Sequence, residues 1–290
     1  MGEEIDGVEG VHPTVVRGVD KVLAVQRPLV MAHIRSIRLR HPNDTPAQLI
    51  HRLEKRYITA VTTGGAGVGA AAVVPGIGTG ASLALAGVET FGFIETTALF
   101  AQSVAEVHGI AVDDPERARA LVLALMLGGP GIDLVRQLSK TVSGGKLTLN
   151  KHWGDLITTS LPTSSVAPLV DKLKPMFLRQ LATRGGASVL GKAAPFGIGA
   201  AIGGIGNNVM ARGILNNARK AFGPAPQTIS PELEPRPDAR PLEHRIARGG
   251  KLVGNAVVAA GSSVGNGVRE LTGKVIKRTP KPKGAPADEQ

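Results

Sequence analysis

The segment YITAVTTGGAGVGAAAVVPGIGTGASLALAGV, residues 57–88, decides the fold of this chain. It contains no charged residue over 32 positions, and only nine of its residues are Ile, Leu or Val. Most of the others are Gly, Ala, Ser or Thr, which allow two helix backbones to approach closely. We therefore expect a helix-packing surface here rather than an ordinary aliphatic core segment.

The spacing of small residues predicts a helical hairpin within this segment. Gly64-Gly65 and Pro75-Gly76 are expected to interrupt the helix, which leaves helical pieces at 66–74 and 78–108 with a turn at Pro75. Residues four apart share one face of a helix. The packing faces would then be formed by these glycines: Gly65, Gly69, Gly76 and Gly80.

A weaker copy of this pattern follows at residues 185–211. The segment AAPFGIGAAIGG (193–204) resembles VVPGIGTGAS (73–82), and Gly199 and Gly203 repeat the spacing of four. The similarity indicates either an internal repeat or a chance likeness between two glycine-rich segments. In both cases we predict an all-α fold, a helical bundle with two Gly/Ala-rich helical hairpins.

Helix signals divide the rest of the chain. Thr45-Pro46 with Gln48 is a capping box, and Asp114-Pro115 begins a helix that should end near Leu127. Prolines and glycines should cut residues 132–184 into short helical fragments. The expected regions are an N-terminal helical arm (1–44), the main helical domain (45–222), a proline-rich linker (223–243), a C-terminal amphipathic helix (244–278) and a disordered tail (279–290).

Composition indicates an anionic partner. The net charge is +11, which suits phospholipid head groups or nucleic acid. Nucleic acid is the poorer fit, because aromatic residues for base stacking make up only 3% of the chain. We expect basic surface at Arg35, Arg38, Arg40, Lys274, Lys277 and Arg278, either as solvated charge or in contact with anionic lipid.

Three charged residues fall within or beside the uncharged segments. Glu89 and Glu95 follow the first one, and Lys192 lies in the second. A buried carboxylate must find a partner or stay protonated, so we expect Lys192 to pair with one of the two acids. Both segments have three possible settings: a transmembrane pair, the core of a soluble bundle, or a hairpin that partly enters the bilayer.

No motif in the sequence specifies a reaction. The segment GASVLGKA (186–193) nearly matches a phosphate-binding loop, but Ala193 lacks the Mg²⁺-binding hydroxyl. The seven histidines show no metal-ligand spacing, and there is no cysteine. We therefore predict no catalytic residue, no cofactor and no metal site.

The order of the motifs resembles that of the EcsC family of bacterial proteins. The helix that follows the first hairpin ends in AEVHGIAVDDP (105–115), and the late element reads GKAAPFGIGAAIGGIGNNVMARGILNNARKAF (191–222). His108 stands where the family commonly has Tyr. The resemblance covers roughly residues 45–222. It implies association with a membrane, because the founding member is associated with an ABC transporter system there.

These observations predict a non-enzymatic, membrane-associated accessory or structural protein that binds anionic lipid or a membrane-protein complex. It would be cytoplasmic, at the inner face of the plasma membrane, and its small-residue helix faces would suit homo-oligomers. One alternative is a soluble, peptidase-like hydrolase, which would need a concave pocket where a carboxylate, His108 or a hydroxyl converge. Another is a nucleic-acid-binding protein, which would need one continuous basic face from Arg35 to Arg56.

Overall fold

The structure is a computed structural model of the chain. It describes Val19, Leu23 and residues 27–71, 79–142, 144, 152–192 and 198–235, with side chains omitted at 66–71, 79–89, 182–192 and 198–204. In the described part the chain forms eight α-helices and no strand, which confirms the all-α prediction. The turn expected at Pro75, most of the N-terminal arm and everything after residue 235 lie outside this description.

The helices follow one another with short connections. They are α2 (Arg27–Arg38), α3 (Pro46–Ala71), α4 (Thr79–Val107), α5 (Pro115–Leu127), α6 (Gly129–Val142), α7 (Trp153–Asp155), α8 (Thr163–Lys192) and α9 (Ile198–Phe222). A π-helical turn, Leu156–Ser160, joins α7 to α8, and a 3₁₀ turn, Pro231–Leu233, follows α9.

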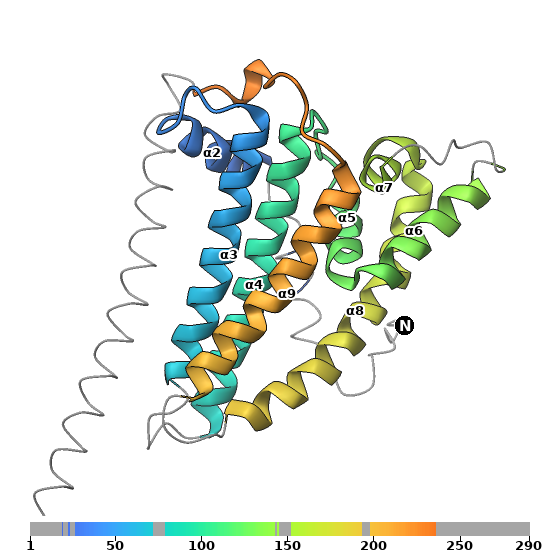
Figure 1. Ribbon diagram of the computed structural model, residues 1–290. Coiled ribbons are helices and arrows are strands. Elements are labelled where there is room, and N and C mark those ends of the chain that lie inside the picture. Colours follow the sequence, from blue (N-terminus) through green and yellow to red (C-terminus); the bar gives the residue numbers. More distant parts are fainter. Residues whose placement is uncertain are drawn as a thin grey trace, which may run out of the picture.

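The long helices α3, α4 and α9 lie together on one side of the bundle, while α5, α6 and α8 form the other side (Figure 1). Helix α3 packs more extensively against α9 than against α4, although α4 follows it in the chain. Side-chain amides close part of this seam: Asn208 donates to the Thr62 hydroxyl at 3.0 Å and Asn207 to the Val61 carbonyl at 3.2 Å. The internal repeat stays a prediction.

The predicted helix starts at Thr45 and Asp114 are confirmed. Thr45 N donates to Gln48 Oε1 at 2.8 Å, and Gln48 N donates to Thr45 Oγ1 at 3.3 Å, so the capping box is complete. Asp114 caps α5 by accepting a hydrogen bond from Glu116 N at 2.9 Å. These caps satisfy backbone N–H groups that have no partner within the helix.

Three expected helix breaks are wrong. Helix α3 runs through Gly64-Gly65, and α8 runs through Pro168 and Pro175. Glycine weakens a helix by about 1 kcal/mol per residue but keeps its backbone hydrogen bonds. In α8 the buried residues Leu169, Leu173 and Phe177 fall on one face, and packing of that face offsets the backbone hydrogen bonds that proline removes.

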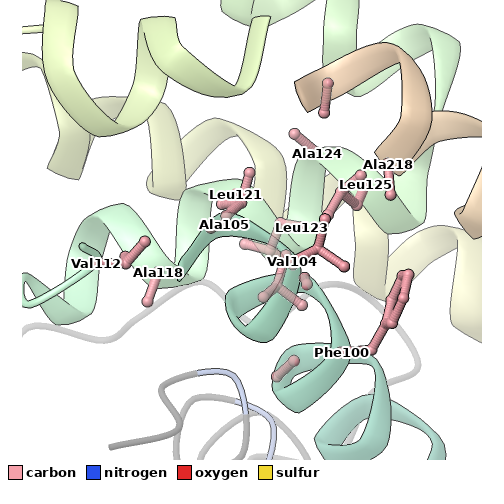
Figure 2. Close-up of a cluster of buried hydrophobic side chains, with 14 of the residues drawn as sticks. Phe100, Val104, Ala105, Val112, Ala118, Leu121, Leu123, Ala124, Leu125 and Ala218 are labelled. Carbon is pink, nitrogen blue, oxygen red and sulfur yellow. The ribbon is translucent and has the colours of Figure 1, made fainter. Parts of the chain in front are cut away.

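The core is aliphatic and centres on α4 and α5. Figure 2 shows Phe100 and Val104 from α4, Leu121, Leu123 and Leu125 from α5, and Ala218 from α9 within one buried cluster. Tyr57 stacks on Phe100 with ring centroids 4.6 Å apart, and its hydroxyl hydrogen-bonds with Thr97 Oγ1 at 2.9 Å. This pairing satisfies a buried polar group inside an otherwise apolar cluster.

Close backbone contact occurs at two glycines that sequence reasoning did not select. A Cβ added at Gly131 of α6 would lie 2.9 Å from the Ala124 Cα of α5. A Cβ at Gly154 of α7 would lie 2.9 Å from the Ala221 carbonyl oxygen of α9. These distances are shorter than van der Waals contact, so only glycine allows these two helix approaches.

We predict that Gly131→Ala lowers the free energy of unfolding by about 1–3 kcal/mol, because the added methyl group overpacks the α5–α6 contact. Gly129→Ala is the matched control, since a Cβ there has no atom within 4 Å. It should change stability by less than about 0.5 kcal/mol. Urea unfolding of both variants measures the difference, and equal effects would contradict the close contact at Gly131.

Candidate functional site

A pocket of about 270 Å³ lies at the end of the bundle where α3, α4 and α9 meet. Its walls are largely apolar and are formed by Ile50, Phe100, Val104, Ala218 and Phe222. Polar side chains also line it, namely His51, Glu54, His108 and Arg219. An apolar cavity with a few converging polar groups is the usual form of a ligand site.

The start of α3 and the end of α9 position the side chains that line this pocket. The capping box fixes the start of α3, so that Leu49, Leu53 and Tyr57 face the core while His51 and Glu54 reach the pocket. Helix α9 ends at Phe222, and the N–H of the next residue, Gly223, donates to the Arg219 carbonyl at 2.9 Å; the φ of Gly223 is +74°. A positive φ favours glycine, and this turn carries the chain past the pocket's rim.

Glu54 and Arg219 form a bidentate ion pair across the α3–α9 seam. The two guanidinium nitrogens Nε and Nη2 each lie 2.8 Å from a carboxylate oxygen of Glu54. The Glu54 side chain is 9% exposed, whereas that of Arg219 is 61% exposed. The hydrogen bond to Glu54 raises the pKa of Arg219. His51 Nδ1 lies 3.9 Å from the Glu54 carboxylate, at the pocket mouth.

His108 enters the pocket from the end of α4. Its Nδ1 lies 2.9 Å from the Val104 carbonyl oxygen, and its ring stacks on Phe222 with centroids 5.3 Å apart. Its Nε2 is buried and has no hydrogen-bond partner in the described part of the protein. His108 is therefore held by a hydrogen bond to the preceding turn of its own helix.

Above the pocket, residues 223–235 form a segment that we call the charged strap. It crosses to α2, where Arg35 donates to the Glu232 carbonyl at 2.8 and 3.1 Å, and Arg38 binds the Glu234 carboxylate. Arg27 forms ion pairs with two carboxylates, that of Glu232 in the strap at 3.0 Å and that of Glu106 in α4 at 2.7 Å. Arginines of α2 therefore fasten the segment that follows α9.

A basic cluster lies at the corner between α2 and α3 and consists of Arg40, Arg52 and Arg56. Arg52 binds the Asp44 carboxylate, but neither Arg40 nor Arg56 has an acidic partner among the described residues. Burial, together with the charges of Arg40 and Arg52, lowers the pKa of Arg56 to about 10. Burial, together with Arg56, lowers the pKa of His33 to about 4.

The structure changes the positions expected for several charged residues. Arg38 is buried rather than on the surface, Arg35 is engaged by the strap, and Arg40 is exposed. Glu95 lies on an exposed face of α4 rather than in an apolar interior, so it needs no buried partner. The side chains of Glu89 and Lys192 lie outside the described part, as do Lys274, Lys277 and Arg278.

The predicted packing glycines are only partly described. Gly65 is buried within α3, and Gly69, Gly80, Gly199 and Gly203 lie in helices whose contacts at these positions are outside the description, together with the whole of Gly76. Their role in packing or oligomer formation stays a prediction.

Sequence reasoning missed Glu54, Glu106 and Arg219. A signal was present for the first of these, because Glu54 lies four residues after Ile50 and three before Tyr57, within an apolar spacing. A charge at such a position is expected to face a buried partner. The partner itself, Arg219, lies 165 residues away and no local pattern indicates it.

Wider comparisons give no test of the family resemblance that the sequence motifs suggested. No protein-family model, curated protein or solved structure matches this chain. Within the described residues no group of side chains could hold a metal ion. In the same part of the chain, no helix combines the length and the apolar character that crossing a membrane requires.

We predict that Arg219→Met lowers the free energy of unfolding by about 1–3 kcal/mol, because it leaves the buried Glu54 carboxylate unpaired. Lys220→Met is the matched control. Lys220 is the next residue in the chain, its side chain is exposed, and its substitution also removes one positive charge. Adding Glu54→Gln to Arg219→Met should recover part of the loss. Urea unfolding gives all three values; equal destabilisation by both Met variants would contradict a structural role for the pair.

We predict that stability falls as the pH drops from about 6.5 towards 4. The unfolded chain protonates His33 near its ordinary pKa of about 6.5, but the folded chain resists protonation until about pH 4. The unfolded state therefore binds more protons in this window, which lowers the free energy of unfolding by about 1–3 kcal/mol. His33→Gln should flatten this slope in urea unfolding, whereas His51→Gln, at an exposed position, should leave it unchanged.

Proposed function

We propose that this chain is a non-enzymatic, membrane-associated helical protein that serves as an accessory or structural component at a bacterial membrane. In this proposal it is peripheral to the inner face of the plasma membrane, where it binds anionic lipid or an acidic face of a membrane complex. The resemblance to the EcsC family, carried by residues 105–115 and 191–222, favours the same setting.

The observation that carries this proposal is the basic cluster at the corner between α2 and α3. Arg40 and Arg56 lie close enough for their charges to interact unfavourably, and the described residues give neither of them an acid. Folding brings the two positive charges close together, so they repel each other. An anion bound next to them would offset this repulsion and stabilise the arrangement. An anionic lipid surface supplies that charge without a specific pocket.

The sequence beyond the described part adds charge of the same sign. Residues 236–290 contain eleven Lys or Arg and five Asp or Glu. Basic residues near an anionic membrane each contribute about 1 kcal/mol to binding, and two separate attachment points bind more strongly than one. Lys274, Lys277 and Arg278 are the basic residues there that we propose contact the lipid.

The two alternative functions receive less support. Among the described residues that line the pocket, none carries a hydroxyl or thiol nucleophile, and Arg219 already occupies the Glu54 carboxylate. Glu54 and His108 do line one pocket, as the hydrolase alternative requires, but no hydroxyl or thiol that could act as the nucleophile joins them among the described residues. A nucleic-acid binder would need a continuous basic face from Arg35 to Arg56, but Arg35 and Arg38 are bound to the strap.

The test is flotation of the full chain with phosphatidylcholine vesicles, with and without phosphatidylglycerol. We expect binding only to the anionic vesicles, and we expect Arg40→Gln combined with Arg56→Gln to weaken it about 30-fold, at about 1 kcal/mol for each charge. The matched control is Arg136→Gln with Lys172→Gln, which removes two exposed charges on α6 and α8. That pair should have a smaller effect.

Salt separates the two modes of attachment. Binding through the basic cluster should be lost at high ionic strength, because surface charges are screened. Binding that survives high salt would indicate that apolar segments also insert. Absence of binding to anionic vesicles at low salt, or equal loss from both double variants, would overturn the proposal.

A further inference from the structure

We propose that the charged strap is a latch that closes over α2 and that opens when the protein binds an anionic membrane. Beneath the strap, Arg35 and Arg38 form what we call the arginine face of α2. While the latch is closed, this face is unavailable to an anion outside the protein. The latch rests on the proposed binding of anionic lipid and supplies a way to regulate that binding.

The strap binds α2 through acidic groups and a carbonyl. It crosses from the end of α9 to α2 as the orange segment of Figure 1. The Glu234 carboxylate binds Arg38, and the Glu232 carboxylate accepts a hydrogen bond from Arg27 at 3.0 Å. Arg35 donates to the Glu232 carbonyl at 2.8 and 3.1 Å. Oxygen atoms of the strap therefore occupy guanidinium donors that could otherwise bind the phosphate group of a lipid.

The closed strap reverses the sign of the charge at this surface. The Arg38 side chain is only 6% exposed beneath it. The carboxylates are more accessible, since the side chains of Glu232 and Glu234 are 59% and 47% exposed. A lipid phosphate that approaches this part of the protein therefore meets two carboxylates before it reaches Arg38. Because like charges repel, closure weakens the attraction of an anionic surface to this end of the bundle.

Few contacts hold the strap closed. Leu233 is the only buried residue between positions 223 and 235, and its side chain belongs to the core cluster. The ion pairs of the strap involve partly exposed groups, and such pairs contribute little to stability. A segment with few buried contacts opens at a lower free energy than the core does. An outside anion can therefore replace the acids of the strap while the bundle stays folded.

An open strap would extend the basic cluster rather than create a separate surface. Arg38 Nη1 donates to the Asp44 carbonyl at 3.0 Å, and the Asp44 carboxylate binds Arg52 of the cluster. The arginine face is therefore continuous with the cluster. Arg27 stays paired with Glu106 of α4 at 2.7 Å, so opening makes two further arginines available and not three.

The membrane and the strap compete for these two arginines. Two further contacts with lipid correspond to about 30-fold tighter binding, at about 1 kcal/mol for each charge. A ligand that binds one of two conformations better shifts the equilibrium towards that conformation. An anionic membrane therefore favours the open strap, and the open strap increases the affinity for the membrane.

The first test opens the latch without changing the charge of the chain. Leu233→Ala removes the buried anchor, and we expect it to bind vesicles that contain phosphatidylglycerol at least about fivefold more tightly, the effect of one further arginine. The matched control is Leu169→Ala in α8, which removes an equally buried side chain. It should lower stability and leave vesicle binding unchanged. Circular dichroism melting confirms that each variant is folded before the comparison.

The second test removes the acids of the strap. Glu232→Gln combined with Glu234→Gln should bind the same vesicles about 30-fold more tightly, because it frees the arginine face and removes two repelling charges. Asp133→Asn combined with Asp171→Asn makes the same change in net charge at exposed positions of α6 and α8, and it should have a smaller effect.

A third variant tests whether the uncovered arginines reach the lipid. Arg35→Gln added to Leu233→Ala should reverse about fivefold of the gain, since Arg35 contacts lipid once the strap is open. Arg136→Gln, at an exposed position of α6, is the control in the same background and should reverse less of it.

Hydrogen exchange reports the strap directly. The N–H groups of Leu233 and Glu234 donate to the carbonyls of Ser230 and Pro231 at 3.0 and 3.2 Å, so the closed strap protects them. Because membrane binding and opening are linked, anionic vesicles should speed the exchange of these two amides in the unaltered chain. Vesicles of phosphatidylcholine alone should not.

The outcomes separate the latch from the proposed function. If the unaltered chain binds anionic vesicles but Leu233→Ala binds them no more tightly, or if the exchange of the strap amides does not change, the latch is wrong and the proposed function stands. If even the opened variants do not bind, the proposed function fails and the latch fails with it. A gain in affinity for a short DNA duplex but not for vesicles would assign the opened face to nucleic acid and would also overturn the latch.

Discussion

The contact between α3 and α9 is the interaction on which the rest of this structure depends. It joins the first long helix of the bundle to the last, and the Glu54–Arg219 ion pair fixes one end of it. The pocket opens beside that pair, and the charged strap starts one turn beyond it. A shift of α9 along α3 would therefore move the pocket wall and the strap together, because both are continuous with the same helix end.

Arginine serves two different purposes within one region of the fold. Arg27, Arg35 and Arg38 turn towards acceptors of the strap and of α4, so their charge is used within the protein. Arg40 and Arg56, a short distance away, have no acid among the described residues. The formal charge of a segment therefore does not say how much of it reaches the surface. An arginine side chain stays available at the surface only where the fold places no carboxylate or carbonyl within hydrogen-bond distance of it.

Local signals in the sequence were enough for the fold class and for two helix starts, since the capping residues at Thr45 and Asp114 act over only three and two positions. They were not enough at Gly64-Gly65, Pro168 and Pro175, where packing of a buried face overrides weak or broken backbone bonding. For the site, His108 and its helix end were visible in the motif. Arg219 and the burial of Arg38 were not, because each depends on a partner more than 150 residues away, and Glu54 was marked only by its place within an apolar spacing.

The pocket lies in a bundle built largely from small and aliphatic side chains, in a chain where aromatic residues are scarce. Phe100, Phe222 and His108 line it from α4 and from the end of α9, and the rings of His108 and Phe222 stack. The Gly131 and Gly154 contacts show that this chain closes its backbones tightly elsewhere. Phe100 and Phe222 form part of the pocket wall, so a smaller side chain at either position should enlarge the pocket.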